Sequence, residues 1–304
     1  MPLRPHRRAW MAAVIAMIAA PARAAAAPLR IVVGFAPGGA SDAVARSFAT
    51  AMQEPLGRPV FVEQRPGADG VVAAQAVASA APDAATLLLG SNTALVAVPA
   101  LRESAPYDPF TAFSPVSGLG WFSMQLLVHA ALPVRSVAEL LQLIERRPGQ
   151  LAAASSNSTA ELAMAQLVGR RRVLGVPYRG DAPALLDLVA GRVQLMFATG
   201  AAADPYVADG RLRRLGTTAA GGGLDVDVTP WLGLFGPAGL SLTSRAAIAQ
   251  AVSTSLHDPV LRRSLATQRF EPHALPPEDF DDFFRRQYGR FVASARRSGL
   301  RLDR

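Results

Sequence analysis

Residues 34–42 carry the clearest chemical signal in the sequence. An apolar run at 29–35 predicts a buried strand, a Pro-Gly-Gly turn follows at 37–39, and Ser41 or Asp42 can cap the next helix. Such a turn directs backbone N–H groups and the positive end of a helix dipole at one point. We therefore predict an anion-binding site here, with an ordinary capped turn as the alternative. The predicted contacts are Phe35, Pro37, Gly38, Gly39, Ala40, Ser41 and Asp42.

Two further polar segments follow predicted strands in the same way. Residues 155–159 come after a strand at 151–154 and offer four hydroxyls, one carboxamide and backbone donors at the start of a helix. Residues 91–93 follow a strand at 86–89. One such loop in each half of the chain fits a single anion shared across a cleft, although a capped helix start is the simpler alternative. The contacts predicted from these segments are Ser91, Asn92, Thr93, Ser155, Ser156, Asn157, Ser158 and Thr159.

Catalytic constellations are hard to find. The chain has no Cys, and all 31 basic residues counted as Lys plus Arg are Arg. This excludes disulfides, thiolate metal sites, Cys nucleophiles, Schiff-base lysines and the Walker P-loop. The four histidines (His6, His129, His257 and His273) are not at metal-ligand spacing, and there is no nucleophile elbow. We predict a binding protein, not an enzyme, with no cofactor or metal.

The N-terminus predicts a secretory signal peptide at residues 1–24. Arginines at 4, 7 and 8 precede a short apolar stretch at 10–20 and a small-x-small cleavage site at 22–24. A membrane anchor is the alternative. Cleavage removes four Arg and no acid from a net charge of +8, leaving +4. We predict a periplasmic protein that does not bind nucleic acid, and we interpret the Arg run at 170–172 as a solvated helix end.

Alternating strands and helices must position these loops, so we predict an α/β fold with parallel sheets. The chain is long for one core, which favours two lobes. We place the crossings near 128–133 and 233–239, so that lobe 1 is 25–127 plus 237–304 and lobe 2, inserted in it, is 128–236. The final helix, 276–298, carries an aromatic stripe that should dock on the core: Phe280, Phe283, Phe284, Tyr288 and Phe291.

Many segments, in order along nearly the whole mature chain, resemble one family, the periplasmic solute-binding proteins of the tripartite tricarboxylate transporters (Bug family). They are 31–42 (IVVGFAPGGASD), 62–70 (VEQRPGADG), 81–83 (APD), 106–109 (PYDP), 136–140 (SVAEL), 176–180 (VPYRG), 191–197 (GRVQLMF) and 231–239 (WLGLFGPAG).

The resemblance implies a two-lobed, Venus-flytrap fold of the type II periplasmic-binding-protein class. It implies capture of a small organic carboxylate, held by the loops at 35–42 and 155–159 through backbone amides and waters, and its delivery to a membrane permease. Tyr178, in the matching VPYRG segment, joins the predicted ligand contacts. We expect a monomer whose lobes close on the ligand.

Four places depart from the family pattern. Ala84 replaces a usual Gly, Glu161 stands where His is common, Ala198 replaces a usual Asp, and residues 216–231 form a shortened stretch. These departures indicate an altered ligand, weakened binding or a degenerate paralogue. The ligand stays open among citrate-like, amino-acid, nicotinate-like and phthalate-like acids. Two other functions stay open: an accessory protein for a membrane sensor kinase, and a secreted hydrolase using Ser41 or Ser156.

Overall fold

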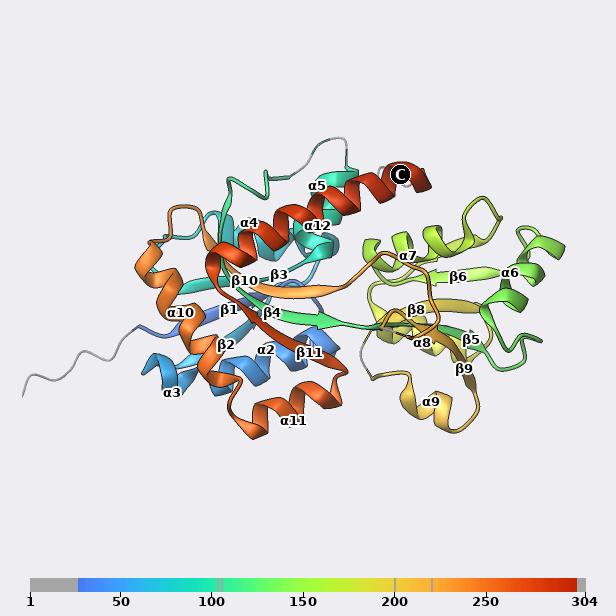
Figure 1. The fold of residues 1–304 in the computed structure, drawn as a ribbon, viewed down its shortest axis with the longest axis horizontal. Coiled ribbons are helices and arrows are strands. Elements are labelled where there is room, and N and C mark those ends of the chain that lie inside the picture. The colour runs from blue at the N-terminus through green and yellow to red at the C-terminus, as the bar shows by residue number, and fades with distance from the viewer. Residues whose placement is uncertain (1–26, 103, 105, 200, 220, 300–304) are drawn as a thin grey trace, which may run out of the picture.

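The computed structural model describes residues 27–102, 104, 106–199, 201–219 and 221–299. The predicted signal peptide therefore lies outside the described residues. Two mixed sheets form two lobes, in agreement with the predicted α/β, two-lobed fold (Figure 1).

The first lobe contains a six-stranded sheet in the order β11-β4-β10-β3-β1-β2. Strands β1, β2 and β3 are parallel, and β10, β4 and β11 continue the sheet in antiparallel pairs. The apolar run of β1 is buried because helices cover both faces of the sheet. The strand bounds are β1 Leu29–Val33, β2 Val60–Gln64, β3 Thr86–Ser91, β4 Phe113–Phe122, β10 Trp231–Pro237 and β11 Phe270–Leu275.

The second lobe contains a five-stranded sheet in the order β7-β6-β8-β5-β9. Strands β6, β7 and β8 are parallel, while β5 runs antiparallel to both of its neighbours. The strand bounds are β5 Met124–His129, β6 Ala152–Ser155, β7 Leu174–Pro177, β8 Leu195–Thr199 and β9 Leu212–Thr217.

The crossings between the lobes differ from the predicted ones. The chain passes from β4 directly into β5 at Ser123, and it returns through residues 218–230. The predicted second lobe, 128–236, therefore starts inside β5 and wrongly includes most of β10, which pairs with β3 and β4 in the first sheet. Strand β4 was not predicted from the sequence, because glycines interrupt its apolar pattern. Gly120 sits at a register irregularity with φ +141°, where a Cβ would lie 2.1 Å from the carbonyl oxygen of Glu271.

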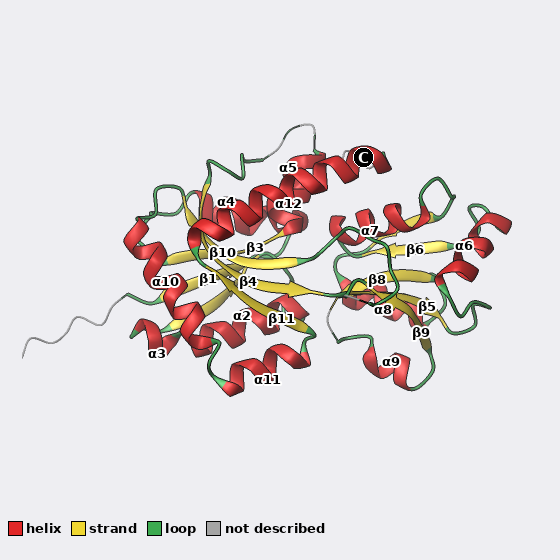
Figure 2. Cartoon of the chain, viewed as in Figure 1, coloured by secondary structure: helices red, strands yellow, loops and turns green. Residues whose placement is uncertain are grey.

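Helices cover both faces of each sheet (Figure 2). Helices α4 and α12 lie on one face of the first sheet and α2, α10 and α11 on the other, while α6 and α7 lie opposite α8 in the second lobe. No described helix is both long and apolar enough to cross a membrane. The bounds are α2 Ala40–Ala51, α3 Gln53–Leu56, η1 Ala68–Gly70, α4 Val71–Ala78, η2 Thr93–Ala97, α5 Val98–Leu101, α6 Val137–Arg146, α7 Ser158–Val168, α8 Asp181–Val189, α9 Asp204–Ala208, α10 Leu242–Ser255, α11 Pro259–Thr267 and α12 Pro277–Ser298.

The aromatic stripe of α12 docks on the first sheet, as predicted. Phe280 and Phe284 are fully buried, and both rings pack edge-on against Trp231 of β10. The sheet makes room for the stripe at Gly233, where a Cβ would lie 2.1 Å from the tip of the Phe280 ring. From there α12 extends across to α7 of the second lobe (Figure 1).

Replacing Phe280 with Ala should destabilise the protein by about 3–5 kcal/mol, because it empties a fully buried aromatic site. Urea unfolding monitored by circular dichroism measures this free energy. Leu242→Ala, at a side chain that is 75% exposed, is the control and should change the stability by no more than about 0.5 kcal/mol. Equal losses in the two variants would contradict the assignment of Phe280 to the core.

Candidate functional site

The loops after the parallel strands of the two lobes meet each other. Thr93, which follows β3, and Thr159, in the first turn of α7, share a hydrogen bond of 3.0 Å between their hydroxyls. The Ser158 hydroxyl donates to the Asp69 carboxylate at 2.7 Å. Since ligands of such folds bind outside the carboxyl ends of the strands, this junction is the candidate site.

The first-lobe loop, residues 34–39, is shaped by Asp42. That carboxylate is 5% exposed, accepts the Gly38 N–H at 2.9 Å, and is paired with Arg46 at 2.9 Å. The Gln64 side-chain amide also donates to it. Asp42 thus stabilises the loop by accepting a hydrogen bond from its backbone, whereas the sequence predicted it as a ligand contact. Neither predicted cap is the N-cap of α2, because that position belongs to Gly39.

The two helices that begin at the site differ at their N-termini. No side chain caps α2, so the N–H groups of its first turn have no acceptor within the helix or from a cap. Residues 36–39 in front of them are exposed. In contrast, the Asn157 side chain caps α7 and accepts from the backbone N–H groups of Thr159 and Ala160, each at 3.0 Å. Of the two helix N-termini, the one of α2 can therefore accept an anion.

Glycines bring three first-lobe loops into backbone contact. A Cβ on Gly34 would lie 2.6 Å from the Cα of Gly70, and one on Gly70 would lie 3.1 Å from the Cβ of Ala94. The turn at 67–70 has positive φ at all four residues, including φ 48° at Ala68 and 60° at Asp69. The sequence prediction did not include Gly34, Asp69 or Gly70 among the site residues. The signal was present, since the RPGADG segment follows a strand as the other loops do.

Other predicted contacts hold the surrounding framework. Asn92 donates to the Thr229 carbonyl at 2.7 Å and accepts the Trp231 N–H at 2.8 Å, which fastens the returning crossing to the first lobe. The Ser91 hydroxyl accepts the Ala94 N–H at 3.4 Å. In the second lobe, Ser155 and Ser156 hydrogen-bond to Asn157.

Tyr178 points its hydroxyl at α8. It donates to Asp187 at 2.8 Å, and Arg192 donates to the other oxygen of the same carboxylate at 2.7 Å. The hydrogen bonds from Arg192 and then Tyr178 lower the pKa of Asp187. Desolvation and the bond to this carboxylate raise the pKa of Tyr178. The phenol therefore stays protonated and structural.

Two of the four departures from the family pattern, at Ala198 and Glu161, lie in the second lobe. Ala198 is buried in β8, and at the end of that strand the Asp181 carboxylate accepts from both the N–H and the hydroxyl of Thr199. An acid from α8 thus lies at the end of β8. Glu161 lies in the first turn of α7, the helix whose N-terminus faces Asp69.

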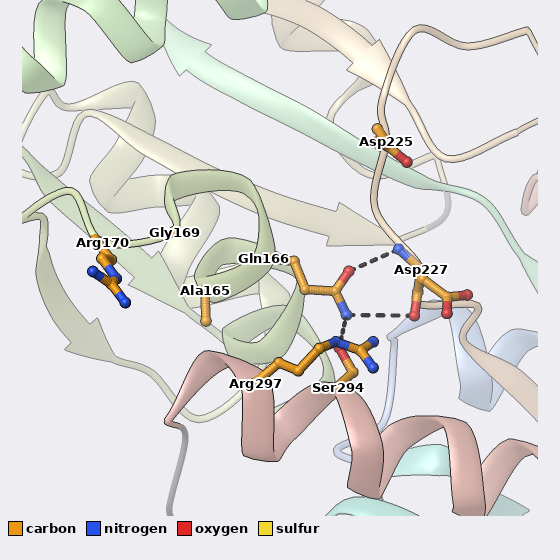
Figure 3. A pocket seen from close by; sticks show the side chains of 8 residues that line it. All are labelled: Ala165, Gln166, Gly169, Arg170, Asp225, Asp227, Ser294 and Arg297. Carbon is orange, nitrogen blue, oxygen red and sulfur yellow. Dashed lines mark hydrogen bonds between the residues drawn. The ribbon is translucent and has the colours of Figure 1, made fainter.

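A cavity of about 360 Å³ lies away from these loops, between the C-terminal half of α7, the returning crossing and α12 (Figure 3). None of the predicted ligand contacts lines it. Gln166 donates to the Ser294 hydroxyl at 2.6 Å and accepts the Asp227 N–H at 2.7 Å. Helix α7 is therefore tied to the first lobe near both of its ends.

The described residues hold no group of three or more His, Asp or Glu placed to bind a metal ion. Among them no histidine hydrogen-bonds to a serine: the His129 and His257 rings contact backbone groups, and His273 packs on Trp121. The arrangement provides backbone donors and hydroxyls for a small anion.

Known proteins resemble this chain in sequence and in structure. Residues 44–299 match the model of the tripartite tricarboxylate transporter family receptor, TctC. The chain is 30% identical to the protein BugT of Bordetella pertussis, over 94% of each chain. An R. palustris protein solved with adipate shares 26% identity with a TM-score of 0.83, covering 91% of this chain and 98% of that one. MatC of Rhodopseudomonas palustris, solved with malate, shares 29% identity with a TM-score of 0.77, covering 88% and 99%.

Gly34→Ala should destabilise the protein by about 1–3 kcal/mol, because the new methyl group meets backbone and not a flexible side chain. It should also separate the loops at 34–39 and 67–70 and weaken ligand binding. Denaturant unfolding measures the first effect and calorimetric titration the second. Gly175→Ala, with no atom within 4 Å of the added Cβ, is the control. If both variants behave like the parent, the contact between Gly34 and Gly70 does not shape the site.

Proposed function

The chain belongs to the tripartite tricarboxylate transporter receptor family of periplasmic solute-binding proteins, and we propose that it binds a small organic carboxylate between its lobes. The observation that carries the proposal is the uncapped N-terminus of α2, which opens beside the junction of the two lobes. Its N–H groups and the helix dipole favour a carboxylate there.

The contacts between the lobes support a closing mechanism. Two pairs of side chains, Thr93 with Thr159 and Asp69 with Ser158, connect the lobes beside the proposed ligand. A ligand that touches both lobes binds the closed form better and shifts the population toward it. The closed, loaded protein would then deliver the ligand to the permease subunits of a tripartite transporter. We also propose that the signal peptide at 1–24 is cleaved and that the mature protein works as a monomer in the periplasm.

The relatives suggest which ligands to test first. Proteins similar to this chain were solved with adipate and with malate, both of which are small dicarboxylates. A thermal-shift screen should cover these two acids, citrate, amino acids and aromatic acids. A true ligand at one hundred times its Kd should stabilise the folded protein by about 2.7 kcal/mol. If no acid in this panel raises the Tm, the proposed function is wrong.

Gly39→Asp should separate binding from stability. Gly39 has φ −82° and ψ 169°, so a side chain fits, and an Asp at this N-cap would offer its carboxylate to the N–H groups of α2. The helix should gain a few tenths of a kcal/mol, whereas carboxylate affinity should fall at least about tenfold because the site is filled. Calorimetry and thermal unfolding measure the two effects.

The control is Gly39→Ala, which adds a Cβ without an acceptor. It should cost about 0.5–1 kcal/mol of stability and keep the affinity within about threefold. Unchanged affinity in the Asp variant would show that the carboxylate binds elsewhere.

A further inference from the structure

Asp69 brings a negative charge to the junction of the lobes. It lies in η1, after β2, and one of its oxygens accepts the Ser158 hydroxyl at 2.7 Å. Gly70, the next residue, touches Gly34 at the start of the loop in front of α2. The turn that carries Asp69 therefore packs against the loop that leads into α2.

No described side chain supplies a cation for this charge. Arg30 and Arg65 are both paired with Glu63, at 3.2 and 2.6 Å, and Arg46 is paired with Asp42. Among the described residues, Asp69 has no Arg or His nitrogen within 4.0 Å. Its charge is uncompensated, unlike the charge of either acid that flanks the same loops.

The backbone at Asp69 favours glycine. With φ 60° and ψ 31° the residue is left-handed, a conformation that costs a non-glycine residue about 1 kcal/mol or more. An Asp tolerates it better than most residues, but among the described residues this side chain makes no cap or turn hydrogen bond and accepts instead from Ser158 of the other lobe. We therefore expect the Asp69 carboxylate to have a role at the junction of the lobes, since the left-handed backbone alone would favour glycine.

The two ends of the site favour ligand groups of opposite charge. The N-terminus of α2 is uncapped and attracts a carboxylate. On the other side, α7 already has Asn157 as its cap, Glu161 in its first turn and Asp69 against its first residue. A second carboxylate of a ligand would meet Asp69 as a like charge, whereas a cationic group would meet an opposite one.

We propose that the ligand is a small carboxylate that also carries a cationic group, and that Asp69 is the counter-charge that selects it over a dicarboxylate. This rests on the proposed function, with the carboxylate of the ligand at α2 and its ammonium-type group at Asp69. Asp69 is then a specificity-determining residue of this chain.

Matched ligand pairs test the proposal. Glutarate and 4-aminobutyrate have the same number of methylenes, as do adipate and 5-aminopentanoate, and in each pair one carboxylate is replaced by an ammonium group. Calorimetric titration should show that the parent protein binds each amino acid at least about tenfold more tightly than its diacid partner. Asp69→Asn should reduce this ratio at least about tenfold.

Two further variants make the result interpretable. Asp69→Gly suits the left-handed backbone, so it should fold at least as stably as the parent and lose the same selectivity. Glu54→Gln removes an equal charge on exposed α3, at the opposite end of the strands, and should leave the ratio unchanged.

The outcomes separate the two proposals. Tighter binding of the diacids by the parent, or an unchanged ratio in both Asp69 variants, would overturn the role of Asp69 while leaving a carboxylate-binding protein. Failure of every acid to bind would overturn the proposed function, and the role of Asp69 with it.

Discussion

The backbone contact between Gly34 and Gly70 is the constraint on which the site depends. It holds the loops after β1 and β2 so close that a side chain on Gly34 would collide with the backbone of Gly70. Gly70 in turn packs on Ala94, so the ends of three parallel strands form one surface. That surface orients the exposed N-terminus of α2, and it brings Asp69 within reach of the second lobe. Close packing without side chains leaves little freedom for these loops to shift independently.

Strands and helices with simple patterns were predictable from the sequence, and irregular ones were not. The apolar run of β1 and the aromatic spacing of α12 each indicated their element and its buried face. Strands β4 and β11 were missed because glycines, prolines and polar residues disturb their alternation. Since β4 continues into β5, missing it also displaced the lobe boundary.

The loops at the candidate site could be predicted from the sequence, whereas the directions of their side chains could not. Strand-end turns located residues 35–42, 91–93 and 155–159, two of which meet through Thr93 and Thr159. The sequence could not show that Asp42 faces its own loop, or that Asn157 occupies the N-terminus of α7. Such roles depend on the directions of side chains, which spacing along the chain does not define. The asymmetry between α2 and α7 therefore emerged only from the structure.

The two hydrogen bonds of Gln166 connect α7 of the second lobe to α12 and to the returning crossing. Its partners are Ser294 on α12 and Asp227 on the returning crossing, and both lie outside the sheet and helices of the second lobe. The cavity of about 360 Å³ at this place is lined by residues of α7, of the returning crossing and of α12 (Figure 3). Under the closing mechanism proposed above, the shape of this groove would differ between the open and the closed protein.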